Sequence, residues 1–512
     1  MATYYFRNTG TNWGNSVDWS ATPFSSGYTA GAVPGTLDDV VFEAASANCI
    51  VNTGATRNCR SLNCAAYTGT ITFNIALSVI GGNITLGTAS MTLTGTFGIT
   101  SNVTGVAAVT YSSAGCICAV PFAIFRAPGG SVAVTMSSNW TQRGNFTLTN
   151  SGATLTFSGN TITFDRTCTI SFSSITGSTI FLLSPIVGNT ITVVGTGGGT
   201  PGVGVPLTIS GAGAVDLNLS FAYSTNTFTY TPASSTVTHT GSLIMSGGAY
   251  NTDGIIFQNG TTSTVGATTS TLASDITFSG NFNIPISIPT FNGVGRRLFV
   301  GGSFTNNNTG GALNGTATLT MNGSGTVSGT STSAFNNTFE INTAGTITFS
   351  GSIQWIRNIT HTSGTVLGST STVTCASAAT FTINAVGFAF NNLVTANATF
   401  TGSQGLTISS YTCAVASSTI TFQSGNTYSI TTVLNLQGNP APARITFRSS
   451  TPGVQANVNL NPAATFSVGY VEATDINSAG GQTIWNYNGA LSNTVNWNIL
   501  QRPVTVGYPW VQ

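Results

Sequence analysis

The sequence predicts an all-β protein, built as a parallel β-helix or solenoid with distinct N- and C-terminal cap elements, and three observations support this prediction. Charged residues make up only 4% of the 512-residue chain, and every cation is an arginine. Gly, Ser, Thr and Asn fill most polar positions and form helices poorly, whereas Thr, Val, Ile and Phe suit a half-buried strand. The composition also barely changes along the chain, as expected when one architecture is repeated.

The chain is hydrophobic enough to bury a core. Hydrophobic residues account for 41% of the sequence, and the formal net charge is +1. Disordered chains usually combine low hydrophobicity with high net charge. We therefore expect a folded chain despite its many polar residues.

Period-two alternation of apolar residues with threonine marks the predicted strands. Each such segment places Ile, Leu, Met or Phe on one face and mostly Thr on the other. Many segments run directly into Ser-Gly or Asn-Gly turns, as Phe157–Asn160 illustrates. The clearest segments are 70–73, 91–94, 145–149, 153–157, 161–164, 275–278, 317–321, 346–349 and 419–422.

A longer recurrence favours a solenoid over a sandwich or an array of barrels. The sequence Ala-Phe-Asn-Asn at residues 334–337 returns 55 residues later at 389–392, and we expect this interval to make two or three solenoid turns. Because each turn pairs with the turns beside it, only the ends of a solenoid leave open strand edges that need caps.

The two ends of the sequence differ from the middle. Five of the seven tryptophans and several acids lie in residues 4–43 and in the last 45 residues. We interpret these segments as amphipathic caps, although the tryptophans of a ligand-binding site would give the same pattern. The predicted organisation is an N-terminal cap or attachment element over 1–48, solenoid repeats over 49–465, and a C-terminal cap and tail over 466–512.

Charge and hydropathy argue against nucleic-acid and membrane partners. Only Arg296 and Arg297 are adjacent cations, so the chain has no basic stripe for phosphates. Polar residues interrupt every apolar run well before the ~20 residues that a membrane-spanning helix needs. The opening residues, Met1–Gly10, lack the charged start and apolar stretch of a secretory signal, so we expect no export by the general secretory route.

The cysteines are interpreted as buried thiols that pack as small hydrophobic side chains. Their spacings do not match the paired Cys-x-x-Cys pattern of zinc sites, and the histidines lie far from most of them, so we predict no metal site and no cofactor. The sequence leaves open whether a disulfide forms among Cys49, Cys59 and Cys64 after release into an oxidising medium. The residues concerned are Cys49, Cys59, Cys64, Cys116, Cys118, Cys168, Cys375, Cys413, His239 and His361.

Both ends resemble β-helical proteins of tailed phages, especially marine ones. At the N-terminus, the resemblance rests on an aromatic opening, an Asp-Trp-Ser element, a Val-Pro pair and an Asp-Asp-Val-Val-Phe strand; at the C-terminus, it rests on a closing unit that contains two tryptophans. It covers about 40 residues at each end, whereas Arg7 and the tail beyond Trp497 depart from the pattern. The segments are 4–13, 18–20, 31–35, 38–42, 470–481, 485 and 496–497.

The resemblance implies a structural virion protein that forms a β-helical appendage, such as a fibre, a spike or a capsid or tail decoration. By analogy it implies a homotrimer that contacts other virion proteins, with host-surface polysaccharide as a candidate partner. The expected location is the virion, which is assembled in the host cytoplasm and released by lysis. The resemblance carries over no catalytic residues, because the matching positions are cap elements.

An enzyme would need clustered carboxylates, and the eleven acids are spread thinly. Asp253 and Asp275 are the one pair of interest, because they precede similar strands 22 residues apart, close to one expected turn. On adjacent turns ~4.8 Å apart, they would approach the ~5–5.5 Å separation found in retaining glycosidases. Like charges at this distance repel, and an acid at a strand entry is ordinary turn chemistry, so we predict no catalytic residue. The alternatives are a glycan-degrading tailspike and a bacterial cell-surface adhesin.

Three other features are candidate contact surfaces. Arg296 and Arg297 are candidates for an anionic glycan or a neighbouring subunit, although a solvated turn explains them better. Sheet faces rich in Asn, Ser and Thr, with aromatics such as Tyr223, Phe228 and Tyr230, suit sugars, but any low-charge solenoid shows such faces. The tail, residues 502–510, is a candidate attachment or oligomer contact, and a disordered end explains it nearly as well.

Overall fold

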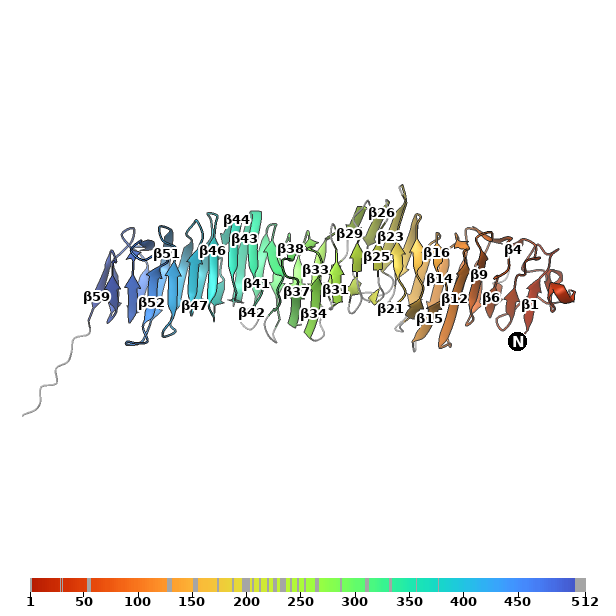
Figure 1. Ribbon diagram of the computed structural model, residues 1–512, viewed down its shortest axis with the longest axis horizontal. Coiled ribbons are helices and arrows are strands. Elements are labelled where there is room, and N and C mark those ends of the chain that lie inside the picture. The colour runs from red at the N-terminus through yellow and green to blue at the C-terminus, as the bar shows by residue number, and fades with distance from the viewer. Residues whose placement is uncertain are drawn as a thin grey trace, which may run out of the picture. The chain divides into compact units, whose positions relative to one another are not determined.

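Nearly all regular structure in the computed structural model is β-strand, and almost every neighbouring pair of strands is parallel (Figure 1). The prediction of an all-β parallel solenoid is therefore confirmed. In the described part of the chain the helical elements are two short 3-10 helices, η1 (Ser16–Asp18) and η2 (Phe24–Ser26), and no helix there is long and apolar enough to cross a membrane. The structure describes residues 2–501, apart from 28, 30, 53–56, 127–130, 151–154, 173–174, 187, 196–202, 205–206, 211–212, 219–220, 224–227, 231–235, 240–241, 246–247, 253–254, 263–266, 286–287, 309–312, 331–333, 356 and 376.

The chain divides into two units, residues 1–259 and 260–512. In the first unit most strands pair with the strand three positions further along the chain, so three strands make one turn. One ladder contains β2 (Trp19–Ser20), β1 (Thr3–Phe6), β3 (Asp39–Val41), β6 (Ser61–Asn63), β9 (Ile84–Thr88), β12 (Ala108–Ala114), β15 (Val132–Met136), β18 (Leu155–Gly159), β21 (Ile175–Gly177) and β24 (Val203–Gly204). A second contains β5 (Arg57–Cys59), β8 (Leu77–Ile80), β11 (Ile99–Asn102), β14 (Phe122–Arg126), β17 (Phe146–Asn150), β20 (Cys168–Phe172), β23 (Thr190–Gly195), β26 (Ala214–Asn218) and β29 (Thr236–His239).

The remaining strands of the first unit lie in one three-stranded ladder and in two longer ones. They are β4 (Cys49–Val51), β7 (Thr70–Phe73), β10 (Thr92–Gly95), β13 (Ile117–Cys118), β16 (Trp140–Gln142), β19 (Ile162–Phe164), β22 (Phe181–Leu183), β25 (Leu207–Ile209), β27 (Phe221–Tyr223), β28 (Phe228–Tyr230), β30 (Ser242–Met245), β31 (Gly248–Asn251) and β32 (Ile256–Phe257).

In the second unit some long strands bend round the corners of the solenoid. The longest, β43 (Phe339–Trp355), pairs with three earlier strands along its length and with two later ones. The other strands are β33 (Asn259–Thr262), β34 (Ala267–Leu272), β35 (Ile276–Phe278), β36 (Phe282–Ile284), β37 (Ile288–Asn292), β38 (Arg297–Val300), β39 (Phe304–Asn306), β40 (Thr318–Met321), β41 (Gly325–Gly329), β42 (Ala334–Phe335), β44 (Ile359–Leu367), β45 (Thr372–Cys375), β46 (Ala379–Ile383), β47 (Ala389–Thr395), β48 (Ala398–Thr401), β49 (Thr407–Cys413), β50 (Thr419–Phe422), β51 (Thr427–Gln437), β52 (Ile445–Ser449), β53 (Ala456–Leu460), β54 (Thr465–Gly469), β55 (Val471–Thr474), β56 (Ile476–Asn477), β57 (Ile484–Tyr487), β58 (Ala490–Ser492) and β59 (Trp497–Leu500).

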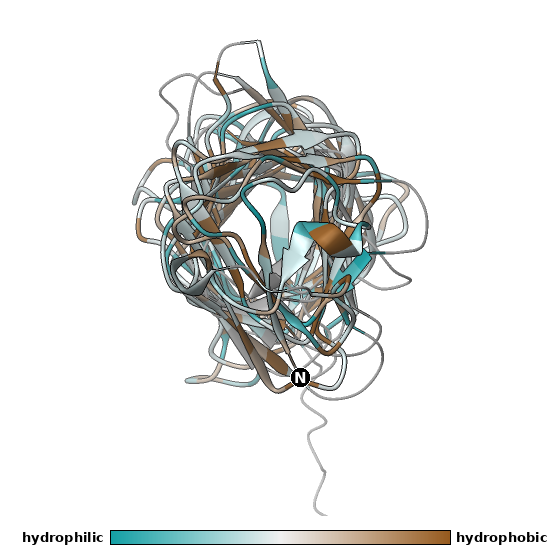
Figure 2. Cartoon of the chain, turned by 90° about the vertical axis from the view of Figure 1, so that its right-hand side faces the viewer, coloured by the Kyte–Doolittle hydropathy of each residue, from teal (hydrophilic) through white to brown (hydrophobic). Residues whose placement is uncertain are grey.

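Alternation along each strand sends apolar side chains into the core of the solenoid. In β46, β48 and β50, for example, Phe381, Phe400 and Phe422 are at most 1% exposed. Their rings stack with centroids 5.0 Å apart in both pairs, close to the ~4.7–4.9 Å spacing of paired strands. Brown and pale segments alternate along the strands in Figure 2, as this pattern requires.

Asparagine side chains connect the corners of successive turns. The Oδ1 atom of Asn48 accepts a hydrogen bond of 2.8 Å from the backbone N–H of Thr70, 22 residues further on. Asn397 and Thr419 make the same contact at 2.7 Å over the same interval. Each such bond occupies a backbone donor that a turn would otherwise leave unpaired.

The length of a turn varies along the second unit. Phe381 lies beside both Ile359 and Phe400, so a turn takes about 20 residues there. Thr421 lies beside Arg448, and this turn is longer because residues 438–444 leave the ladder between β51 and β52. The strands on both sides keep their parallel register despite the extra residues.

The 55-residue recurrence is not a stacking period. Ala334 lies beside Gln354, Gln354 beside Thr374, and Thr374 beside Val394. The column that begins at Ala334 therefore does not reach Ala389, where the recurring segment begins. The two segments occupy different positions in their turns, because similar strand-and-turn chemistry recurs at more than one corner.

The tryptophans of the N-terminal segment belong to the core of the first turns. Trp13 and Trp19 are 0% exposed, and their ring centroids lie 4.9 Å apart. Phe6 and Phe42 pack against Trp19, whose indole N–H donates a hydrogen bond of 2.7 Å to the carbonyl of Trp13. The strand β2 runs antiparallel to β1 and ends its ladder. These tryptophans pack internally and are not exposed for a ligand.

At the other end, the two tryptophans of the described chain differ in exposure. Trp497 is 5% exposed and donates an indole hydrogen bond of 2.8 Å to Ser478 Oγ, whereas Trp485 is 46% exposed. The predicted tail contact, residues 502–510, lies outside the described residues.

Candidate ligand-binding groove

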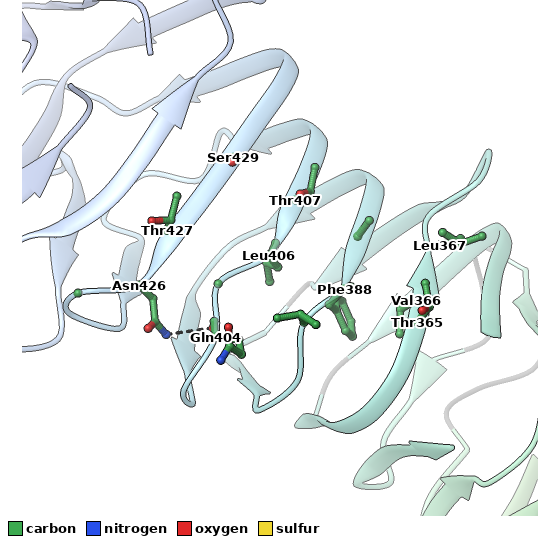
Figure 3. Close-up of a pocket in the computed structure, with 15 residues that line it drawn as sticks. Thr365, Val366, Leu367, Phe388, Gln404, Leu406, Thr407, Asn426, Thr427 and Ser429 are labelled. Carbon is green, nitrogen blue, oxygen red and sulfur yellow. Dashed lines mark hydrogen bonds between the residues drawn. The ribbon is translucent and has the colours of Figure 1, made fainter. Parts of the chain in front are cut away.

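A surface groove of about 560 Å³ crosses four successive turns of the second unit (Figure 3). The residues that line it come from the end of β44, the start of β47, β49 and β51, and the corners that precede these strands. Four strands at ~4.8 Å spacing make the groove about 14 Å long across the turns. None of the lining residues is charged.

Glycine occupies equivalent positions in two adjacent turns of the groove. Val366 lies beside Phe388, and Ala389 lies beside Thr407, so Gly387 and Gly405 follow Thr365 in one column. Gly387 has φ +87°, which disfavours any residue with a side chain. A Cβ atom on Gly405 would come within 1.6 Å of the Thr427 carbonyl oxygen. Both positions therefore have to lack side chains.

Core residues form the floor of the groove. Val366, Phe388 and Leu406 are at most 5% exposed. The His361 ring packs edge-on against Phe388 with centroids 5.1 Å apart, and its Nε2 atom lies 3.0 Å from the carbonyl oxygen of Gly364. Burial lowers the pKa of His361, and backbone hydrogen bonds only partly oppose this shift, so the ring is neutral at pH 7.

Five uncharged polar side chains line the groove without a partner in the described part of the chain. Thr365, Thr407 and Thr427 are exposed, and Gln404 and Ser429 are half-buried. Figure 3 shows these side chains on both sides of the turn that carries Phe388. By contrast, hydroxyl groups on β46 and β48 pair with each other along the ladder, as those of Thr382 and Thr401 do at 3.0 Å. The hydroxyl and amide groups of the groove are therefore free to bind a ligand.

The backbone of the groove is already paired, and its corner is braced. The N–H groups of Val366, Thr407 and Ser429 each donate a hydrogen bond to the carbonyl of a neighbouring turn. Asn426 Nδ2 donates to the carbonyls of Gly402 and Gln404, both at 3.0 Å, and Figure 3 shows the second of these bonds. The groove is thus a pre-formed surface with no open strand edge.

The structure does not test the predicted Asp253 and Asp275 pair, because Asp253 lies outside the described residues. Asp275 Oδ1 accepts a hydrogen bond of 2.9 Å from the backbone N–H of Arg297, 22 residues further on. This contact joins two successive turns, as expected for an acid at a strand entry.

Most of the described carboxylates, Asp275 among them, hold structural contacts. Eight acids accept hydrogen bonds from backbone N–H groups, arginine, asparagine or hydroxyl groups, and Asp165, for example, receives two from Arg143 at 2.9 and 2.8 Å. The eight are Asp18, Asp38, Asp39, Glu43, Asp165, Asp275, Glu340 and Asp475.

The adjacent arginines have different surroundings. Arg296 is exposed in the turn after Gly295. Arg297 forms an ion pair with Glu340, and its guanidinium carbon lies 5.9 Å from the centroid of the Phe299 ring. The side chains of Tyr223, Phe228 and Tyr230 lie outside the described part of the structure.

All eight cysteines are buried free thiols, as predicted, and Cys49, Cys59 and Cys64 form no disulfide. Burial raises the pKa of Cys116 to about 11 and that of Cys168 to about 12. Among the described residues, no group of three or more His, Cys, Asp or Glu side chains is placed to bind a metal ion.

Sequence reasoning did not find the groove. Its components lie at intervals of about one turn, and only the register shows that Gly387 and Gly405 are neighbours. A search for glycine at a turn-length interval, rather than for the 55-residue recurrence, would have identified it.

The fold and the groove define the chain as a parallel β-solenoid with an uncharged surface groove. No protein-family model, curated protein or solved structure matches this chain.

Proposed function

We propose that this chain is a non-catalytic structural protein of a tailed-phage virion, where it forms a β-solenoid appendage that contacts host-surface glycans. The observation that carries the proposal is the use of the scarce carboxylates as structural groups. Eight of them accept hydrogen bonds, and several of these contacts join successive turns.

The arrangement of ionic pairs supports this proposal. Arg60 pairs with Asp39 and Arg143 with Asp165, each across about one turn. Although burial raises the pKa of Asp39, hydrogen bonds from Arg60 and Ser61 outweigh the effect of burial and lower this pKa, so this carboxylate is poorly placed to act as a general acid. Arginine–carboxylate pairs that join successive turns support a role in stabilising the solenoid rather than in hydrolysis.

The phage assignment rests on the terminal segments, including the aromatic and acidic residues 4–42 and 470–497. Mass spectrometry of purified particles of a phage that carries this gene tests it directly. We expect peptides of this chain in stoichiometric amounts, and their absence from the particles would contradict a virion role.

An activity assay separates the structural role from a depolymerase. Purified protein is incubated with host polysaccharide, and new reducing ends or unsaturated sugars are measured beside a heat-unfolded sample. We expect no release above this control. Release that Asp275→Asn or Glu340→Gln abolishes would overturn the proposal in favour of a glycan-degrading tailspike.

A further inference from the structure

We infer that the groove across β44, β47, β49 and β51 binds an uncharged oligosaccharide that lies across the turns of the solenoid. This inference rests on the glycan contact of the proposed function and assigns it to one site. The glycine column, the free polar side chains and the absence of charge carry it.

The lining groups match the chemistry of a neutral sugar. Thr365, Thr407, Thr427 and Ser429 supply hydroxyl groups that both donate and accept hydrogen bonds, and Gln404 supplies an amide that does the same. A chain of sugar rings carries hydroxyl groups at regular intervals and requires such paired donors and acceptors. An anionic ligand would need arginine, lysine or histidine at the surface, and the lining has none.

The shape of the groove favours an extended ligand. Free polar side chains lie on three of the four turns, with Thr365 at one end and Thr427 and Ser429 at the other, and the turn that contains Gly387 contributes none. A length of about 14 Å accommodates a short stretch of linked sugar rings rather than a single one. The side chains of Leu367 (46% exposed) and Val386 (72% exposed) offer apolar contacts at one end.

A peptide strand fits this surface poorly. Extended peptides usually bind by adding a strand to an open sheet edge, with main-chain hydrogen bonds providing affinity. In the groove the backbone N–H groups of Val366, Thr407 and Ser429 are bonded to neighbouring turns. The available contacts are therefore side-chain hydroxyl and amide groups, which favours the sugar.

Binding to a panel of neutral and acidic polysaccharides tests the inference, with dextran, mannan, alginate and hyaluronan as the first probes and isothermal titration as the readout. We expect binding to at least one neutral member, none to the acidic members, and little change between low and high salt, because a neutral ligand is not screened. Binding restricted to acidic members, or to none of the neutral ones, would overturn the inference.

Three variants locate the site. Ala389 is half-buried on the outer face of β47 and lies beside Thr407, so Ala389→Tyr fills the groove without altering the core. We expect this variant to lose binding and Thr407→Val to weaken it about fivefold, the usual contribution of one hydrogen bond. Thr399→Val, on β48, which pairs with β46 and β50 and lines no part of the groove, is the matched control and should bind normally.

Unchanged binding by Ala389→Tyr would overturn the inference, as would equal loss in Thr399→Val. Binding of uncharged peptides in place of polysaccharide would overturn it too. The mass spectrometry of phage particles is independent of these results, so failure at the groove is distinguishable from failure of the virion role.

Discussion

The stacked phenylalanines of the second unit allow a quantitative test of how the solenoid is stabilised. Phe400 is 0% exposed, and its ring stacks at 5.0 Å on Phe381 and on Phe422. Truncation of a buried phenylalanine to alanine costs about 3–5 kcal/mol, and each aromatic pair contributes about 0.5–1.5 kcal/mol beyond its buried area. Phe400 also packs against Tyr411 and Tyr428. Because the substitution removes all of these aromatic pairs, we expect Phe400→Ala to cost about 4–5 kcal/mol, the upper part of that range.

Hydrogen–deuterium exchange measures this cost locally. Since each 1.4 kcal/mol is tenfold, about 4 kcal/mol lowers protection of the amides in β46, β48 and β50 roughly 1,000-fold. A solenoid turn contacts mainly its neighbours, so amides of β1 and β3 should keep their protection. The matched control is Val386→Ala, at a side chain that is 72% exposed, with an expected cost within about 0.5 kcal/mol. A loss below about tenfold at β48, or an equal loss in the control, would refute the role assigned to the stack.

Three further predictions follow from the described contacts. The pKa of His361 is lowered in the folded chain, so only the unfolded chain binds an extra proton on this residue as pH falls below ~6.5. Thermal melts should therefore show that the chain loses stability below this pH, and that His361→Phe loses less. Equal slopes of stability against pH in the two proteins would argue against a buried neutral ring. Burial raises the pKa of Asp39, but hydrogen bonds from Arg60 and Ser61 outweigh burial and lower this pKa overall. In urea melts at pH 7, Asp39→Asn should lower the free energy of unfolding by about 1 kcal/mol. The loss should be smaller at pH 3, because protonation of Asp39 weakens the same contacts in the unsubstituted chain. The eight buried thiols should resist iodoacetamide at pH 8 in the folded chain, and all eight should react in guanidinium. Mass spectrometry gives the number of labelled cysteines. Rapid labelling of the folded chain would contradict their burial.

The direction of side chains could be predicted from the sequence, because alternation needs no knowledge of the partner strand. Ile71 and Phe73 of the Thr-Ile-Thr-Phe segment are 0% exposed, as the period of two requires. Burial of the cysteines could also be predicted, because their spacings match no metal site and a free thiol packs as a small hydrophobic side chain.

The neighbours of each strand could not be predicted, because register depends on the length of every turn. Thr421 and Arg448 are adjacent across a longer turn than Ile359 and Phe381, and nothing local in the sequence announces the difference. The candidate groove depends on register at four successive turns, so it was missed. The buried ring of His361 was missed for the same reason: its contact with Phe388 joins two turns.

The longer turn at residues 438–444 marks a corner where the solenoid tolerates inserted residues. The ladder on either side keeps its register, so the added segment perturbs neither the hydrogen bonds nor the aromatic core. Corners of this kind are where insertions arise in evolution without penalty to the scaffold. An epitope tag or a fluorescent reporter placed there would decorate the solenoid while leaving its strands and its groove as they are.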